Sequence, residues 1–137
     1  MGLNHSIENY SGLEGVGSIV DEALAFLVDN GVNLNKFGFR LVLTEALNNA
    51  VIHGHAGETG LMVHLNIKVS GTKLLFEIVN QGSGFNWQEA LERSKYKEQN
   101  DPFSEGGRGF MIYNLYGYGF SFEDCGRQLN LTKVLDD

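Results

Sequence analysis

The chain has 137 residues, which is the length of one domain and enough to bury a hydrophobic core. Hydrophobic residues make up 42% of it and charged residues 20%, an ordinary globular composition that excludes a disordered or fibrous protein. The 17 acidic residues outnumber the 10 lysines and arginines, so the net charge is -7, and no basic segment is dense enough to bind nucleic acid directly.

Cysteine content and hydropathy exclude two further classes of protein. Cys125 is the single cysteine, so no internal disulfide can form; we interpret it as a small turn residue and expect a reducing compartment. No apolar run approaches the roughly 20 residues that a membrane span needs, and the polar first residues are no signal peptide. We therefore expect a single cytoplasmic domain over residues 1–137 without a membrane partner.

Two helices are predicted in the first third of the chain. The first has apolar residues at the spacing of one helix face, and they are Val16, Ile19, Val20, Ala23, Leu24 and Leu27. Asn30 and Gly31 are expected to end it. The second is predicted over residues 36–53, and its apolar arc consists of Phe39, Val42, Leu43, Ala46, Leu47 and Ala50. Gly54 is expected to end this helix.

Strand patterns dominate the rest of the chain. Residues 61–69 alternate between apolar and polar, as a half-buried strand requires, and a tight turn at 70–72 leads into a second strand over 73–79. Residues 118–122 and 128–132 predict a closing hairpin. Between these hairpins lie a short predicted helix at 87–94 in a polar, candidate mobile loop at 86–106, and an apolar helix at 110–115.

This order of elements predicts an α+β fold. Helices come early and antiparallel strands come late, so we expect a two-layer α/β sandwich with the helices on one face of a mixed, mainly antiparallel sheet.

The second predicted helix carries polar residues at a regular spacing. Glu45, Asn49 and His53 are four residues apart, so each step turns by only about 40° and the three side chains face one place. They could be boundary residues that cap or pair locally. However, the adjacent Asn48 and Asn49 are mediocre helix formers, which favours a ligand-binding role. Asn49 could supply one oxygen to Mg²⁺, and Glu45 could orient or deprotonate an attacking hydroxyl or water.

Two glycine clusters follow downstream, and they consist of Gly82 and Gly84, then Gly106, Gly107 and Gly109. The first pair ends a predicted strand and could form only a bend. The second surrounds Arg108 directly before the apolar helix that begins near Phe110. There the backbone N–H groups could approach phosphates at the positive end of the helix, although a flexible loop is the alternative.

Together these residues resemble the Bergerat-fold (GHKL) ATP-binding superfamily of gyrase, histidine kinases and mismatch-repair ATPases. Within it, the chain is similar to the anti-sigma factor serine/threonine kinase family. The stretch from Glu45 to Gly54 resembles the N box, the stretch from Asn80 to Phe85 the G1 box, and the stretch from Gly106 to Phe110 the G2 box. The resemblance covers roughly residues 14–134, and only residues 4–9 are available for the strand with which the family usually opens.

The resemblance implies a role for each matching residue. Glu45 would be the catalytic residue that activates the nucleophile, and Asn49 the ligand of Mg²⁺. The set implied to bind ATP consists of Asn49, His53, Asn80, Gly82, Gly84, Gly106, Gly107, Arg108, Gly109 and Phe110.

One residue departs from the family pattern. The G1 box normally begins with an aspartate that accepts a hydrogen bond from the adenine amino group, and this chain has Asn80 there. An amide oxygen accepts the same bond without charge assistance, which weakens it by about 1–2 kcal/mol, or roughly tenfold in affinity.

The resemblance implies an ATP-dependent serine-protein kinase that is also an anti-sigma factor. Its expected partners are a sigma factor and an anti-anti-sigma protein of the STAS type, and family members commonly form homodimers. The alternative, favoured by Asn80, is a regulatory binding module with a weakened nucleotide site and no catalysis. The third interpretation is a structural domain without a ligand. It requires that the N, G1 and G2 boxes occur in the family order by chance.

Overall fold

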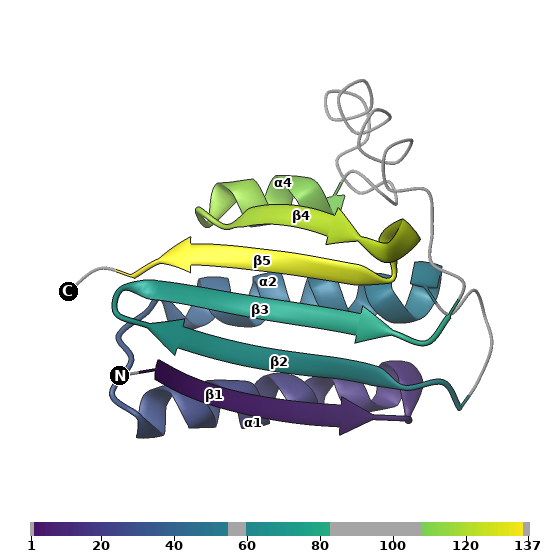
Figure 1. Cartoon of the computed structure of the whole chain (residues 1–137), viewed down its shortest axis with the longest axis horizontal. Helices are drawn as coiled ribbons and strands as arrows, with labels where there is room; N and C mark the ends of the chain where they lie inside the picture. The colour runs from purple at the N-terminus through teal and green to yellow at the C-terminus, as the bar shows by residue number, and fades with distance from the viewer. Residues whose placement is uncertain (1, 55–59, 83–107, 136–137) are drawn as a thin grey trace.

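A five-stranded sheet covered by helices on one face forms the domain. The computed structural model describes residues 2–54, 60–82 and 108–135 (Figure 1). The strands are β1 (Gly2–Asn9), β2 (Val63–Ser70), β3 (Lys73–Asn80), β4 (Gly119–Glu123) and β5 (Gln128–Val134), in the spatial order β1-β2-β3-β5-β4. The helices are α1 (Val16–Asp29), α2 (Lys36–Asn49) and α4 (Arg108–Leu115). The predicted α+β sandwich is confirmed, and the sheet is antiparallel at every pairing rather than mixed.

Helix α1 follows its predicted pattern closely. Its buried residues are Val16, Ile19, Val20, Ala23, Leu24 and Leu27, the same set that the periodicity selects. The helix ends at Asn30, whose backbone N–H donates to the carbonyl of Phe26. The next residue, Gly31, has a positive φ of 75°. A positive φ strains residues that have a Cβ, which is why glycine follows the helix end.

Helix α2 begins as predicted and changes its geometry before its predicted end. The side chain of Asn35 caps it by accepting a hydrogen bond of 3.0 Å from the backbone N–H of Gly38. At the other end the α-helix stops at Asn49 and continues as a π-helical turn, Ala50–Gly54. Glu45 and Asn49 therefore lie one α-helical turn apart on α2, whereas His53 belongs to the π-helical turn, and its side chain lies outside what the structure describes.

The core lies between the sheet and the helices. Fully buried strand residues on the helix-facing side include Leu65, Ile67, Phe76 and Leu131. The predicted hairpin is confirmed, with Gly71 at a φ of 59° in the turn between β2 and β3. Cys125 is exposed in the turn between β4 and β5, as its turn position predicted. In the described part of the chain, no helix combines the length and apolar character needed to cross a bilayer.

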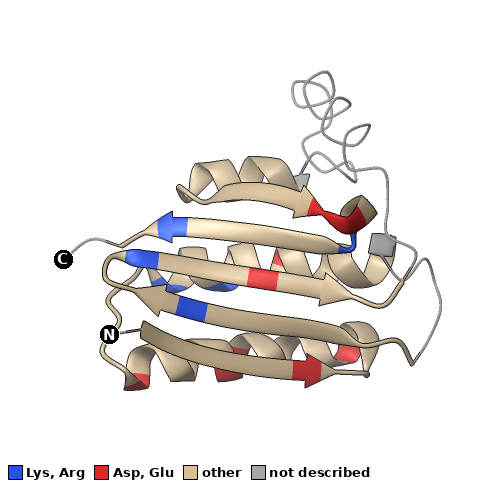
Figure 2. Ribbon diagram, in the orientation of Figure 1, with Lys and Arg blue, Asp and Glu red and all other residues tan. Residues whose placement is uncertain are grey.

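Charged residues on the strands separate along the sheet. Register places Lys68, Lys73 and Lys133 near the β2–β3 turn, whereas Glu8 and Glu123 lie toward the opposite end (Figure 2). The end with the β2–β3 turn is therefore the more basic end of the sheet.

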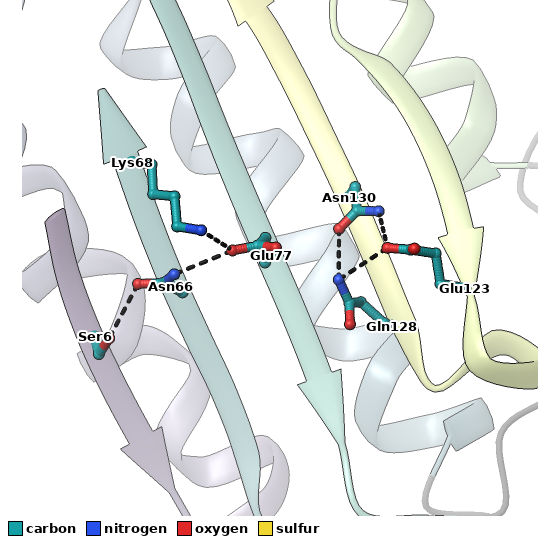
Figure 3. A network of polar contacts seen from close by, with 7 residues as sticks. All are labelled: Ser6, Asn66, Lys68, Glu77, Glu123, Gln128 and Asn130. Carbon is teal, nitrogen blue, oxygen red and sulfur yellow. Dashed lines mark hydrogen bonds and ion pairs between the residues drawn. The ribbon is translucent and has the colours of Figure 1, made fainter. Parts of the chain in front are cut away.

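The outer face of the sheet is polar and carries a row of side chains across the strands (Figure 3). Residues directly opposite one another in this row are Ser6, Asn66, Glu77, Asn130 and Ser121. Asn66 donates to Glu77 at 3.1 Å, and Lys68 lies 3.0 Å from the same oxygen. The hydrogen bond from Lys68 holds the pKa of Glu77 below its usual value despite partial burial. The apolar core therefore lies on the helix-facing side of the sheet, and the other face is polar.

Candidate functional site

Residues from two predicted boxes meet where α4 begins on the C-terminal half of α2. Gly109, the second residue of α4, packs so closely that a Cβ on it would lie 2.6 Å from Nδ2 of Asn49 and 3.7 Å from Cγ of Glu45. Real Cβ atoms do not approach other atoms at 2.6 Å, so only glycine allows this contact without displacing the Asn49 amide. The fold thus brings Glu45, Asn49 and Gly109 together.

Glu45 is buried at this junction. It is 8% exposed, whereas Asn49 one turn later is half-buried. A carboxylate is seldom placed inside a protein unless it is paired or has a task, because burial disfavours its charge. The burial of Glu45 fits a task at this junction, and it also fits the alternative of a boundary residue that pairs locally.

Tyr113 belongs to the same junction, and the sequence did not single it out. It is 1% exposed, and its hydroxyl lies 3.5 Å from the Cβ position of Gly109. Burial is the largest effect on the Tyr113 hydroxyl and raises its pKa. The hydrogen bond with Asn49 lowers this pKa, whereas the charge of Glu45 raises it, and the net result is a pKa far above the usual value of tyrosine. Tyr113 therefore remains a neutral phenol that can hold the Asn49 amide. Its spacing of four residues from Gly109 was the available signal, since such residues share a helix face.

Asn80 ends β3 and is almost completely buried, at 5% exposed. Its side-chain oxygen accepts a hydrogen bond of 2.9 Å from the N–H of Gly82, and its side-chain nitrogen donates to the carbonyl of Arg127 at 3.3 Å. Arg127 in turn donates from Nε to the carbonyl of Gly82 at 3.1 Å. An aspartate at position 80 could not donate to Arg127 and would place a second oxygen opposite that carbonyl. The departure from the family pattern thus has a structural reason.

The other predicted site residues fall into three groups. His53 lies in the π-helical turn, and Arg108 begins α4. Phe110 is 7% exposed, and its ring stacks on Phe120 with centroids 5.0 Å apart, so its side chain is part of the core. Gly84, Gly106 and Gly107 lie outside the described residues, as do the predicted helix at 87–94 and the polar loop at 86–106.

The donors at this junction fit a nucleotide with a magnesium ion. The N–H groups in the first turn of a helix have no partners within the helix and form its positive end, which attracts phosphate. At α4 this end lies beside an amide, that of Asn49, and a buried carboxylate, that of Glu45. Mg²⁺ takes oxygen ligands and completes its shell with water and phosphate, so one amide oxygen from the protein suffices.

The fold and this junction define a class of protein: an α+β domain whose site pairs a helix-borne carboxylate and amide with the start of a second helix. A family model for the histidine kinase-like ATPase domain matches residues 13–133, and the chain belongs to this family. The predicted resemblance to the GHKL-type ATPases is thereby confirmed, and an ATPase domain implies ATP binding. No curated protein matches the chain in sequence.

Proposed function

We propose that this protein is an ATP-binding anti-sigma factor and serine-protein kinase that phosphorylates an anti-anti-sigma partner in a partner-switching system. The observation that carries the proposal is the approach of Gly109 to Asn49 and Glu45. A carboxylate beside a magnesium ligand and a helix start is the arrangement that phosphoryl transfer needs, since this reaction depends on positioning and charge stabilisation.

Each residue at the junction has a distinct task in this proposal. Asn49 offers its side-chain oxygen to Mg²⁺, and Tyr113 holds the Asn49 amide in place. Bound Mg²⁺-ATP supplies the phosphoryl group and neutralises charge on the phosphates. Glu45 orients the serine hydroxyl of the partner and accepts its proton, while the first-turn amides of α4 bind the negative charge of the phosphates.

The proposed protein partners are inferred from the family resemblance and not from the geometry of the Asn49 junction. The N, G1 and G2 boxes occur in the order of the anti-sigma kinases, whose partners are sigma factors and STAS-type proteins. Cytoplasmic location and a homodimer are part of the same proposal.

A second candidate function is a regulatory binding module that holds nucleotide weakly and transfers no phosphate. Asn80 favours it, because both ends of its amide already bond to Gly82 and Arg127. An adenine amino group must therefore share the side-chain oxygen with the N–H of Gly82. The buried position of Glu45 beside Asn49 favours the kinase.

Calorimetric titration with ATP and ADP, with and without Mg²⁺, tests the nucleotide site. We expect Asn49→Ala to weaken the magnesium-dependent binding about tenfold or more, because the protein oxygen of the metal shell is lost. Asn48→Ala is the matched control, since it makes the same change about 100° away around the helix and should bind normally. Equal affinities for the two variants would remove Asn49 from the site.

Phosphate transfer to a purified STAS-type protein then separates the two candidate functions. We expect Glu45→Gln to retain nucleotide and to transfer phosphate about 10²–10⁴ times more slowly, the usual contribution of a general base. A wild-type protein that binds Mg²⁺-ATP and transfers nothing would support the binding module instead.

A further inference from the structure

A cavity lies at the end of α2 opposite the Asn49 junction. Its volume is about 640 Å³, and its walls come from the segment before α2, the first turns of α2, the turn between α4 and β4, and the end of β5. This volume is within the range of small-molecule sites, roughly 300–1,000 Å³. Asn35 and Asn49 stand at the two ends of α2, and at 1.5 Å per residue the helix separates the cavity from the junction by about 20 Å.

Tyr118 lines this cavity and is almost completely buried. The residue is 4% exposed, and among the residues that the structure describes no side chain or backbone group forms a hydrogen bond with its hydroxyl. Burial raises the pKa of Tyr118 to about 12, so the phenol stays neutral and able to donate. Buried tyrosine hydroxyls normally have a hydrogen-bond partner, and here the cavity is the space from which one can come.

Lys133 brings a positive charge to the same cavity. It lies on the helix-facing side of β5, in line with the buried Leu129 and Leu131, and its Nζ is 5.5 Å from the centre of the Tyr118 ring. None of the described lining residues is acidic, and no carboxylate among residues 2–54, 60–82 and 108–135 forms an ion pair with Lys133. Lys68 and Lys73 lie at the same end of the sheet but on its outer face, and Lys68 is paired there with Glu77 (Figure 2).

The remaining wall of the cavity contains both polar and apolar residues and is shaped by a close contact. Asn33 and Asn35 contribute amides, and Leu115 and Tyr116 contribute apolar surface. A Cβ on Gly38 would lie 2.5 Å from Cδ1 of Tyr116, so the absence of a side chain lets this ring pack against the first turn of α2. An apolar body would thus find aromatic and aliphatic contacts next to the lysine.

We propose that this cavity is a second ligand site, which binds a small organic acid whose carboxylate is attached to an apolar, ring-sized body. Lys133 pairs with the carboxylate, the Tyr118 hydroxyl donates to it, and Leu115 and Tyr116 cover the body. Charge-assisted hydrogen bonds of this kind are stronger than neutral ones. The proposal is independent of nucleotide binding and of kinase activity at the other end of α2.

NMR titration of the ¹⁵N-labelled protein with 3-phenylpropionate tests the site, with 3-phenylpropan-1-ol as the neutral probe of matched shape. We expect the acid to shift the amide signals of Gly38, Gly117 and Leu135, and to leave that of Gly109 in place. We expect the alcohol to bind about tenfold more weakly, because it cannot pair with Lys133. The absence of shifts up to about 10 mM acid, an affinity too weak for a specific site, would overturn the proposal.

Two variants separate a ligand site from a merely apolar cavity. Lys133→Met should weaken binding of the acid about tenfold, whereas Lys73→Met, which removes a lysine from the outer face of the neighbouring strand, should not. Tyr118→Phe should weaken binding severalfold and leave the Tm of the ligand-free protein unchanged or higher, since no internal bond is lost. A lower Tm would reveal an internal partner of the hydroxyl, and equal affinities for acid and alcohol would exclude recognition of the charge; either result contradicts the proposal.

Discussion

The two ends of α2 show how one helix can support two different chemical environments. At the C-terminal end, Glu45 and Asn49 meet the start of α4, and the closest contact joins Gly109 to an amide at the tip of a short side chain. At the N-terminal end, Gly38 meets the ring of Tyr116 in the wall of a cavity that contains Lys133. The first end presents oxygen ligands and helix amides, and the second presents a cation beside apolar surface.

This difference shows that the effect of adding a side chain at a closely packed glycine depends on the group that the glycine contacts. An amide can turn away from an added methyl group, but its position relative to a ligand changes when it does. An aromatic ring packed into a wall cannot move as freely, so the added methyl group strains the fold instead. We therefore expect changes at the first end to affect binding and changes at the second to affect stability.

Phe39→Ala should have the largest effect, because Phe39 connects the cavity to the core. Its ring is fully buried and lies 5.4 Å from that of Phe76. Loss of a buried phenylalanine ring costs about 3–5 kcal/mol, from lost transfer free energy and the void that remains. Unfolding in urea measures this loss.

Phe37→Ala is the matched control, since Phe37 lies two residues earlier and is 68% exposed. Its free energy of unfolding should change by less than about 1 kcal/mol, the usual range for a surface position with one aromatic contact. Similar losses in the two variants would contradict the description of Phe39 as the link to the core.

Alkaline pH should lower the free energy of unfolding through the ionisation of two buried tyrosines, Tyr113 and Tyr118, which lie near opposite ends of α2. The ordinary pKa of tyrosine is 10.0, and burial raises the pKa of Tyr118 to about 12 and that of Tyr113 further. The unfolded chain therefore loses these protons first, and stability falls as the pH rises from 10. For Tyr118 the loss by pH 12 is about 2–3 kcal/mol, from two pKa units at 1.36 kcal/mol each.

Urea unfolding at a series of pH values measures this slope. Tyr118→Phe should make it shallower above pH 10, because phenylalanine does not titrate. An unchanged slope in that variant would mean that the Tyr118 hydroxyl ionises as readily in the folded protein as in the unfolded chain.

Alanine at the two contact glycines should separate the ends directly. Gly38→Ala should lower the free energy of unfolding by about 1–3 kcal/mol, the usual cost of an overpacked site. Gly109→Ala should change stability less and weaken magnesium-dependent nucleotide binding by about tenfold, because the Asn49 amide must move. Chemical unfolding and calorimetry measure the two effects.

Gly17→Ala is the control for both, since Gly17 is exposed in α1 and nothing lies within 4 Å of its Cβ position. There the methyl group should raise stability by about 0.5–1 kcal/mol, the gain in helix propensity. If Gly109→Ala lost stability and Gly38→Ala did not, the comparison between the two ends would be reversed.

Most of the fold could be predicted because it follows from local patterns. The six apolar positions of α1 and the alternation in β2 mark the core-facing sides of those elements, and all six helix positions are buried. The change from α- to π-helix at Ala50 could not be predicted from the same periodicity, since the apolar spacing continues there. The sheet was expected to be mixed because antiparallel pairing of distant strands leaves no mark in the sequence.

The candidate site could be predicted in part. Glu45 and Asn49 were selected from their spacing on one helix and Gly109 from its glycine cluster, and these three lie together. Tyr113 was missed because a tyrosine within an apolar helix pattern is read as a core residue, and the pattern gives no information on what its hydroxyl contacts. Arg127 was missed because its bonds to Gly82 and Asn80 depend on the pairing of β3 with β5.

The sequence by itself thus determined the elements, the buried face of each, and the family to which three ordered boxes point, because side-chain periodicity and motif spacing are properties of neighbouring residues. Only the tertiary structure decided that Gly109 lies on Asn49, that Asn80 bonds to Arg127, and that Lys133 shares a cavity with Tyr118. These contacts join segments far apart in the chain, and their geometry depends on how the sheet and helices pack together.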